Sequence, residues 1–171
     1  MSSAHQNLSG VPLLTFPEAK HLRIAIVYAR WNEQVTLAMS SAADEYLSAC
    51  GLSQEQILHV PVPGTYELPA GAQACFEEAS CDAVICIGCV IQGETRHFDF
   101  ICQGVTNGIM EVMIKYAKPV AFGVLTTENL QQAMDRCGGK HGNKGTEAAY
   151  TVMDMLHTMH KLRKGELFKS K

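Results

Sequence analysis

The chain has 171 residues, which is enough for one compact domain and too few for two. Its formal net charge of −3 provides no basic face, so nucleic acid is not an expected partner. The longest apolar run, residues 83–91, is too short to span a bilayer, so we expect no membrane association. The N-terminal residues lack the basic and apolar segments of a secretory signal, so we expect a cytoplasmic location.

Residues 1–20 mix Ser, His, Gln, Pro and Gly without a period and are predicted to form a flexible arm. A single domain of residues 21–165 follows. It begins with the continuous apolar run of residues 23–28, which predicts a strand buried on both faces. Residues 33–50 predict a helix that ends at the next residue, a glycine.

The strand–helix order repeats along the rest of the chain. The predicted elements are a strand at 57–62, a helix at 67–80, a strand at 82–88, a helix at 97–117, a strand at 120–125, a short helix at 131–137 that Thr127 can cap, and a last helix from the glycine-rich residues 138–145 to Lys164. Residues 166–171 are predicted to be a polar tail. This order predicts a parallel sheet covered on both faces, an α/β protein with a four-stranded, three-layer α/β/α sandwich of the flavodoxin-like kind.

The seven cysteines are odd in number and lie mainly in apolar stretches. This distribution indicates thiols used as small hydrophobic side chains in a reducing compartment. Cys86 and Cys89 form a C-x-x-C motif, but a redox pair of this kind opens a helix after a strand, whereas here the motif ends a strand. His157 and His160 share a helical face without the further ligands of a metal site, so no metal is expected.

Ligands of such folds bind beyond the carboxyl ends of the strands, which selects the loops at residues 30–32, 63–67, 89–97 and 126–128. Trp31, the only tryptophan, follows the first strand directly. Its ring either stacks on a planar heterocycle or covers the sheet as a core residue, and the sequence favours neither. Glu67 either accepts hydrogen bonds from a polyol or, as is more common at a helix start, favours the helix dipole.

Residues 88–95, Gly-Cys-Val-Ile-Gln-Gly-Glu-Thr, nearly match a P-loop. Glu94 stands where a P-loop has lysine, and a carboxylate there would repel a triphosphate, so we expect no NTPase. A single phosphate fits the backbone N–H groups around Gly93 and Thr95 at the next helix start. His97 follows in the same crevice and is the best candidate for proton transfer near neutral pH.

A phosphate site without a lysine in its own loop needs positive charge from elsewhere. Arg136 and Lys144 flank the glycine-rich residues 138–145. They either complement a helix end or bind phosphate, for which the bidentate geometry of arginine is well suited. The loop need not reach the crevice of its own subunit, because a neighbouring subunit can supply it.

Five segments in order resemble the lumazine synthases of riboflavin biosynthesis. They are ARWN at 29–32, VPGTYELP at 62–69, IGCVIQGETRHFDF at 87–100, FGVLTTENLQQAMDRCGGKHGNKG at 122–145 and the helix after it. The resemblance implies a transferase that condenses 5-amino-6-(D-ribitylamino)uracil with 3,4-dihydroxy-2-butanone 4-phosphate. The implied products are 6,7-dimethyl-8-ribityllumazine, phosphate and water, and no cofactor or metal is needed.

The resemblance also implies a role for each matched residue. His97 would transfer protons. The substrate would be held by Trp31, Thr65, Tyr66, Glu67, Cys89, Val90, Ile91 and Phe122, and the phosphate by Glu94, Thr95 and Arg136, with Lys144 as a weaker candidate. Phe122 and Arg136 would come from the adjacent subunit.

The family builds homopentamers, and some members close twelve of them into a 60-subunit icosahedral shell. The short turn at residues 138–145 favours the shell here, and riboflavin synthase is a further partner that the resemblance suggests. Two other functions stay open on the sequence. One is a flavodoxin-like flavin carrier, which would bleach reversibly on reduction, and the other is a shell protein without catalysis, which would assemble without consuming substrates.

Overall fold

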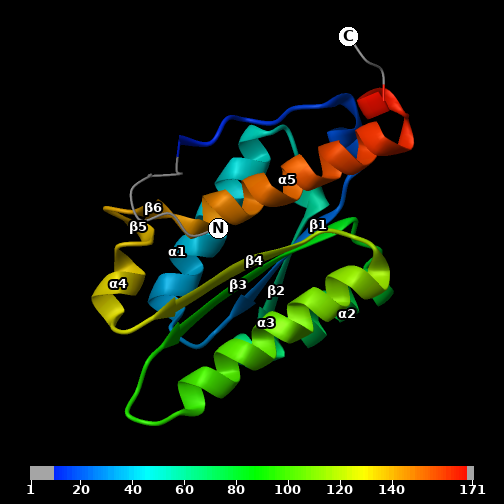
Figure 1. Cartoon of the computed structure of the whole chain (residues 1–171). Helices are drawn as coiled ribbons and strands as arrows, with labels where there is room; N and C mark the ends of the chain where they lie inside the picture. Colours follow the sequence, from blue (N-terminus) through cyan, green and yellow to red (C-terminus); the bar gives the residue numbers. More distant parts are fainter. Residues whose placement is uncertain (1–9, 169–171) are drawn as a thin grey trace.

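The computed structural model describes residues 10–168 and is a three-layer α/β/α sandwich, which confirms the predicted fold class (Figure 1). The central sheet has four parallel strands in the order β2-β1-β3-β4. Their bounds are Ile24–Ala29 for β1, Ile57–Val62 for β2, Ala83–Ile91 for β3 and Val120–Thr127 for β4. Strands β1 and β3 therefore lie inside the sheet and are flanked on both sides, whereas β2 and β4 form its edges.

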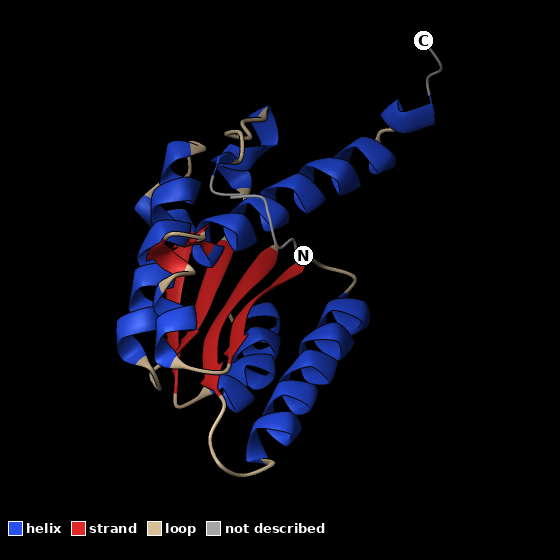
Figure 2. Ribbon diagram, turned by 60° about the vertical axis from the view of Figure 1, so that its left-hand side comes forward, coloured by secondary structure: helices blue, strands red, loops and turns tan. Residues whose placement is uncertain are grey.

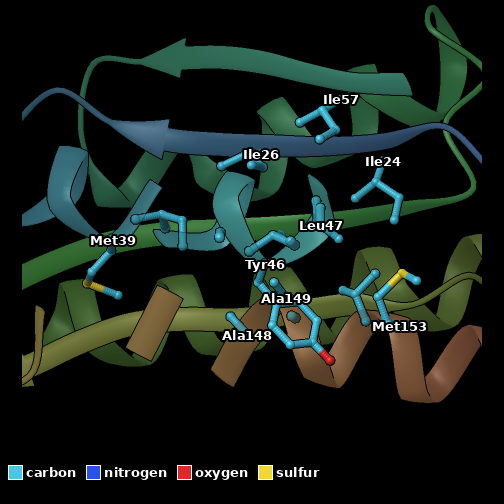
Figure 3. Packing of buried hydrophobic residues seen from close by; sticks show 14 of the residues in the cluster. Ile24, Ile26, Met39, Tyr46, Leu47, Ile57, Ala148, Ala149 and Met153 are labelled. Carbon is cyan, nitrogen blue, oxygen red and sulfur yellow. The ribbon is translucent and has the colours of Figure 1, made fainter. Parts of the chain in front are cut away.

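Two pairs of helices cover the two faces of the sheet (Figure 2). Helices α1 (Glu33–Ala49) and α5 (Lys144–Arg163) lie on one face, and α2 (Leu68–Glu77) and α3 (His97–Tyr116) lie on the other. Alternate residues of β1 enter the two cores, because successive side chains of a strand point to opposite faces. Figure 3 shows Ile24 and Ile26 of β1 packed with Met39 and Leu47 of α1 and Met153 of α5.

Strands β3 and β4 extend beyond their predicted ends at residues 88 and 125. Their ladder continues to the pair Ile91–Thr127, so the backbone groups of these last residues are paired although the side chains become less apolar. The predicted loops at 89–97 and 126–128 therefore begin two or three residues later. Side-chain hydropathy marks the buried part of a strand, and the ladder runs past it.

Helix α4 (Leu130–Met134) is shorter than the predicted helix at 131–137, and the prediction that Thr127 caps it is wrong. The cap is Asn129, whose side-chain oxygen accepts a hydrogen bond from the backbone N–H of Gln132 at 2.9 Å. Thr127 instead ends β4. The glycine-rich segment forms a small antiparallel hairpin of β5 (Cys137–Gly139) and β6 (Gly142–Asn143), which takes Cys137 out of the helix.

Part of the predicted N-terminal arm packs against the domain, along the face formed by α1 and α5 (Figure 1). Residues 1–9 lie outside the described residues. Tyr46 donates a hydrogen bond from its hydroxyl to the Pro12 carbonyl at 2.7 Å, and the rings of Phe16 and His157 stack with centroids 4.9 Å apart. The turn η2 (Pro17–His21) then leads into β1. Of the predicted polar tail, residues 166–168 form a 3-10 turn and residues 169–171 lie outside the described residues.

The helix predicted at 67–80 is preceded by a 3-10 turn, η4 (Thr65–Glu67), and ends early at Glu77. A second 3-10 turn, η3 (Gln54–Gln56), precedes β2. No helix within residues 10–168 combines the length and the apolar character needed to cross a membrane.

Candidate active site

Three hydrogen bonds connect the chain segments at the carboxyl ends of all four strands. The Arg30 N–H donates to the Val62 carbonyl at 2.9 Å, which joins the ends of β1 and β2. The Asn32 side chain donates from Nδ2 to the Cys89 carbonyl at 2.8 Å, which joins the β1–α1 loop to β3. The Gln92 N–H donates to the Thr127 carbonyl at 2.8 Å, which joins β3 to β4. The predicted loops thus converge on one edge of the sheet.

Trp31 presents its side chain to solvent at this edge, with 71% of its surface exposed. The alternative that it is a core residue is therefore wrong, and the ring is available for stacking. The next residue, Asn32, has φ 59° and ψ 44°, the left-handed conformation that turns the chain from β1 into α1. Asparagine tolerates this conformation better than most residues, and the turn leaves Trp31 outside the core.

Thr65, Tyr66 and Glu67 form η4, between the end of β2 and α2. Thr65 is buried and packs so closely on Gly88 of β3 that a Cβ at Gly88 would lie 2.9 Å from its hydroxyl oxygen. Tyr66 is 58% exposed, and its ring lies over Gly104 of α3. Glu67 is half-buried. This turn therefore presents an aromatic ring and a carboxylate beside the end of β3.

Cys89, Val90 and Ile91 are the last residues of β3 rather than loop residues. Cys89 is buried, and burial, with a further contribution from Cys137, raises the pKa of its thiol to about 11. The thiol therefore stays protonated near neutral pH, and it is the Cys89 carbonyl that faces the β1–α1 loop. Cys86 and Cys89 lie in the cores on opposite faces of the sheet, so the C-x-x-C motif does not bring two thiols together.

The segment between β3 and α3, residues 92–96, is exposed along its whole length, and His97 begins α3 with an exposed side chain. No side chain caps this helix start within the described residues. The Arg96 Nε atom lies 3.9 Å from the Asp99 Oδ2 atom. Both side chains are largely exposed, so this ion pair contributes little to the stability of the fold. Gly88 lies inside β3, so the G-x-x-x-x-G segment is mostly strand and does not form a P-loop. Glu94 and Thr95 therefore flank an open helix N-terminus.

Phe122 lies on the edge strand β4, pairs with Cys86 of β3, and is 44% exposed. It is five residues before the end of β4, and at about 3.3 Å per residue this places it roughly 16 Å back from the carboxyl edge. The structure does not bring Phe122 to the crevice of its own chain. Its side chain lies on the same face of the sheet as Val120 and Val124, the face covered by α2 and α3, and is partly exposed beside the open edge of the sheet.

Arg136 follows α4 and is half-buried; its guanidinium donates to the Gln132 carbonyl at 2.9 Å. Within residues 10–168 no hydrogen bond or ion pair joins it to residues 92–97. Lys144 donates from Nζ to both carboxylate oxygens of Glu147 at 2.8 Å, and Glu147 is buried. The Lys144 N–H also donates to the Arg136 carbonyl at 2.9 Å, and this backbone hydrogen bond closes the base of the β5–β6 hairpin.

One chain thus brings together most of the predicted site at the carboxyl edge of the sheet: Trp31, Thr65, Tyr66, Glu67, Cys89, Val90, Ile91, Glu94, Thr95 and His97. Phe122, Arg136 and Lys144 lie on the β4 and α4 side.

The sequence analysis assigned no role to Asn32, although its side chain donates the hydrogen bond between the β1–α1 loop and β3. Its position directly after Trp31, in a loop at the end of a strand, was the sequence feature that could have indicated this role. Among the described residues, no group of three or more His, Cys, Asp or Glu side chains is arranged to hold a metal ion.

Comparison with known proteins decides the family. A model of the 6,7-dimethyl-8-ribityllumazine synthase family matches residues 21–160. The chain belongs to this family. A 6,7-dimethyl-8-ribityllumazine synthase of Cytophaga hutchinsonii is 53% identical over 156 residues, covering 91% of this chain and 98% of the relative. Those of Porphyromonas gingivalis and Flavobacterium johnsoniae are 48% and 46% identical, covering 91% and 92% of this chain and 96% and 83% of the relatives.

The part of the chain that matches the 6,7-dimethyl-8-ribityllumazine synthase family contains the whole sheet and every predicted site residue. The match therefore includes both the carboxyl edge of the sheet and the separate group on the β4 and α4 side.

Proposed function

We propose that the chain condenses 5-amino-6-(D-ribitylamino)uracil with 3,4-dihydroxy-2-butanone 4-phosphate, releasing phosphate and water and forming 6,7-dimethyl-8-ribityllumazine. This is the penultimate step of riboflavin biosynthesis. The observation that carries the proposal is the family match across residues 21–160, supported by identities of up to 53% over nearly full-length relatives. The edge of the sheet adds the chemistry, because exposed rings, a carboxylate, a helix N-terminus and a histidine lie together there.

The pyrimidine ring stacks on Trp31, and the ribityl chain extends towards η4. The exposure of Trp31 and Tyr66 supports this arrangement, since both rings are free of the core. Glu67 accepts hydrogen bonds from ribityl hydroxyls, as a carboxylate can accept two or more. Backbone groups of Cys89, Val90 and Ile91 line the ring pocket. The raised pKa of the Cys89 thiol supports a contribution from its backbone rather than from a thiolate.

The phosphate binds at the N-terminus of α3, beside Glu94 and Thr95. The open helix start supports this, because its N–H groups and dipole favour an anion. The substrate amine attacks the ketone to form an imine, phosphate is eliminated and the ring closes. Each step moves protons, and His97, exposed at the same helix start, relays them. Holding the two substrates together contributes much of the acceleration, up to roughly 7–11 kcal/mol in favourable cases.

A neighbouring subunit completes the site with Phe122 and Arg136. The distance of Phe122 from its own crevice, about 16 Å along β4 at 3.3 Å per residue, supports a contribution between subunits. Arg136 supplies a guanidinium with bidentate geometry to a phosphate loop that has no P-loop lysine. Lys144 is a weaker candidate for this role, because its amine is paired with Glu147.

The outer face of α3 supports a ring of subunits. Phe100, Met110 and Ile114 are exposed and lie within about 80° of one another around the helix axis, at 100° per residue. The buried residues of α3, Val105, Ile109 and Val112, lie on the opposite side. The same arc also contains the exposed polar residues Gln103 and Asn107, and a mixture of large apolar and polar side chains is typical of surfaces that pack against another chain. We propose a homopentamer built on this face, and a 60-subunit icosahedral shell of twelve pentamers that encloses or binds riboflavin synthase.

The seven free cysteines, of which only Cys102 is not buried, support a reducing compartment and hence the cytoplasm.

One assay tests the reaction. The purified chain is mixed with both substrates, and formation of the fluorescent lumazine and release of phosphate are followed together. Equal rates of the two products, dependent on both substrates, are expected. A folded and assembled protein that forms neither product would overturn the proposal and leave a shell protein without catalysis. Sedimentation or light scattering tests the assembly, where a bare pentamer mass would exclude the shell.

A further inference from the structure

We propose that Cys75 and Cys81 form a dithiol site that a low-molecular-weight disulfide of the glutathione kind converts into an intramolecular disulfide. Cys75 lies in the last turn of α2, and Cys81 lies in the turn that leads into β3. The site is at the amino end of β3, opposite the candidate active site. It rests on a different part of the chain from the proposed condensation and uses none of its residues.

The backbone already holds the two cysteines at disulfide distance. The Cys81 N–H donates to the Cys75 carbonyl at 3.1 Å. The bond lengths on either side of one backbone hydrogen bond keep the Cα atoms of its two residues roughly 5–7 Å apart, and disulfides span roughly 4.4–6.8 Å between Cα atoms. Both side chains enter the same core, between the sheet and helices α2 and α3. Each thiol also shifts the pKa of the other, so the two side chains lie close together and little backbone movement is needed to join them.

The surroundings lower the pKa of the Cys81 thiol and raise that of the Cys75 thiol, so Cys81 is the nucleophile and Cys75 is its partner. The hydrogen bond from Cys75 lowers the pKa of Cys81, with Arg23 and Lys118 adding to this effect and burial and Asp82 opposing it. The Lys118 ammonium donates to the Cys81 carbonyl at 2.7 Å, and the Arg23 guanidinium donates to the Ala79 carbonyl at 3.1 Å, so both cations are fixed beside this turn. The same hydrogen bond, together with burial, raises the pKa of Cys75.

Access to the buried pair runs through the turn between α2 and β3. Ser80 in this turn has φ 51°, a left-handed conformation that is costly for a residue with a Cβ. Glu78 and Ser80 are exposed, so opening these few residues uncovers Cys81 without disturbing the sheet. Local openings of this kind require far less free energy than global unfolding.

The reaction is two thiol–disulfide exchanges. The Cys81 thiolate attacks one sulfur of the small disulfide, whose S–S bond breaks, and one thiolate leaves and takes up a proton. Cys75 loses its proton and attacks the Cys81 sulfur of the mixed disulfide, which expels the second small thiol. The protein loses two electrons and two protons, and the small disulfide is reduced to two thiols. In a reducing compartment the pair is therefore at rest as thiols and responds to an oxidising shift.

Peptide mapping of the folded full-length protein tests the site. The protein is incubated with oxidised glutathione, alkylated and digested without reduction, by cleavage after glutamate and before aspartate. Cleavage at Glu77 or Glu78 separates Cys75 from Cys81, and cleavage before Asp82 separates Cys81 from Cys86 and Cys89. We expect a disulfide between the peptide of residues 68–77 and the peptide that ends at Cys81, and two fewer free thiols per chain.

Three variants distinguish the proposed roles. Cys75→Ala is expected to stop at glutathionylated Cys81, whereas Cys81→Ala is expected to leave Cys75 unreacted. Cys86→Ala, a buried cysteine of the same core, should form the same disulfide as the wild type. Reaction of Cys102 alone, a link from Cys75 to Cys86 or Cys89, or a persistent mixed disulfide in the wild type would overturn the proposal. The wild-type map decides even where a variant does not fold.

Lumazine formation is measured on the oxidised and reduced protein in parallel. The eight steps of β3 from Ala83 to Ile91 place the dithiol site at least about 26 Å from the carboxyl edge, at 3.3 Å per residue, so equal turnover is expected. The disulfide map is read whether or not the protein has lumazine synthase activity. Failure of the dithiol site and failure of the proposed function therefore give different results.

Discussion

Replacing Asn32 tests whether its amide hydrogen bond and its left-handed conformation hold the β1–α1 loop in place. Asn32→Ala removes the bond to the Cys89 carbonyl, worth about 1 kcal/mol, and places a residue without a compensating side chain at φ 59°, which costs about 1 kcal/mol more. We expect a loss of about 2 kcal/mol in the free energy of unfolding. Asn32→Gly loses the same bond but adopts the left-handed conformation freely, so its loss should be about 1 kcal/mol.

Urea unfolding followed by far-ultraviolet circular dichroism at one fixed protein concentration measures both variants, because subunit association contributes to the apparent stability. In the folded variants, the loop that carries Trp31 should be less well ordered, and KM for the pyrimidine substrate should rise more than KM for the butanone phosphate. Equal destabilisation by alanine and glycine would refute the conformational part of this reasoning. An alanine variant as stable as the wild type would refute both parts.

Substitutions at three further positions test other parts of the molecule. His97→Ala should lower kcat by about 100-fold without abolishing turnover, because binding of both substrates is retained. Trp31→Ala should raise KM for the pyrimidine up to about 10-fold, the upper end for a lost aromatic stack, whereas Trp31→Phe should change it little. The hydrogen bond from Lys164 lowers the pKa of Glu18 from 4.5 to about 2, so this contact is fully present above pH 4.5 and is lost as the pH falls towards 2. Hydrogen exchange of residues 10–22 should therefore be faster in Glu18→Gln than in the wild type at pH 5, and the difference should disappear as the pH falls through 2.

Each of these has a clear contrary result. Complete loss of turnover in folded His97→Ala would show that proton transfer by this residue is indispensable. An unchanged pyrimidine KM in Trp31→Ala would exclude stacking on this ring. A Glu18→Gln variant with wild-type exchange at pH 5 would show that the pairs with His160 and Lys164 do not hold the N-terminal segment.

The sheet and the position of the crevice were predictable from the sequence because they depend on local patterns. Buried parallel strands appear as continuous apolar runs, and their alternation with helices leaves one topology class. The strand ends were less accurate. Val90 and Ile91 are half-buried and Thr126 is exposed, so hydropathy stops marking β3 and β4 before their ladder ends.

Other features depend on contacts between segments far apart in the chain. The packing of Phe16 on His157 and the hydrogen bond from Tyr46 to Pro12 connect the N-terminal segment to α5 and α1. The apolar residues Val11, Leu14 and Phe16 were a sign of packing, but the segment has no period that shows where it packs. The hydrogen bond from Asn32 to Cys89 spans 57 residues. The Cys75–Cys81 pair follows no short motif, whereas the visible C-x-x-C motif has its thiols on opposite faces of the sheet.

The roles of Phe122 and Arg136 could not be derived from one chain, because they are expected to act on a neighbouring subunit. The structure supports this expectation through position: Phe122 is partly exposed on the edge strand β4 and Arg136 is held by α4.

Subunit complementation is the most direct test of a site shared between chains. His97→Ala and Arg136→Ala are each prepared alone and then co-assembled in equal amounts. If His97 and Arg136 of adjacent subunits form one site in a closed ring, about a quarter of the sites in random mixed rings regain both residues, and lumazine formation should rise to roughly a quarter of the wild-type rate. A mixed assembly no more active than the average of its two parents would contradict the account.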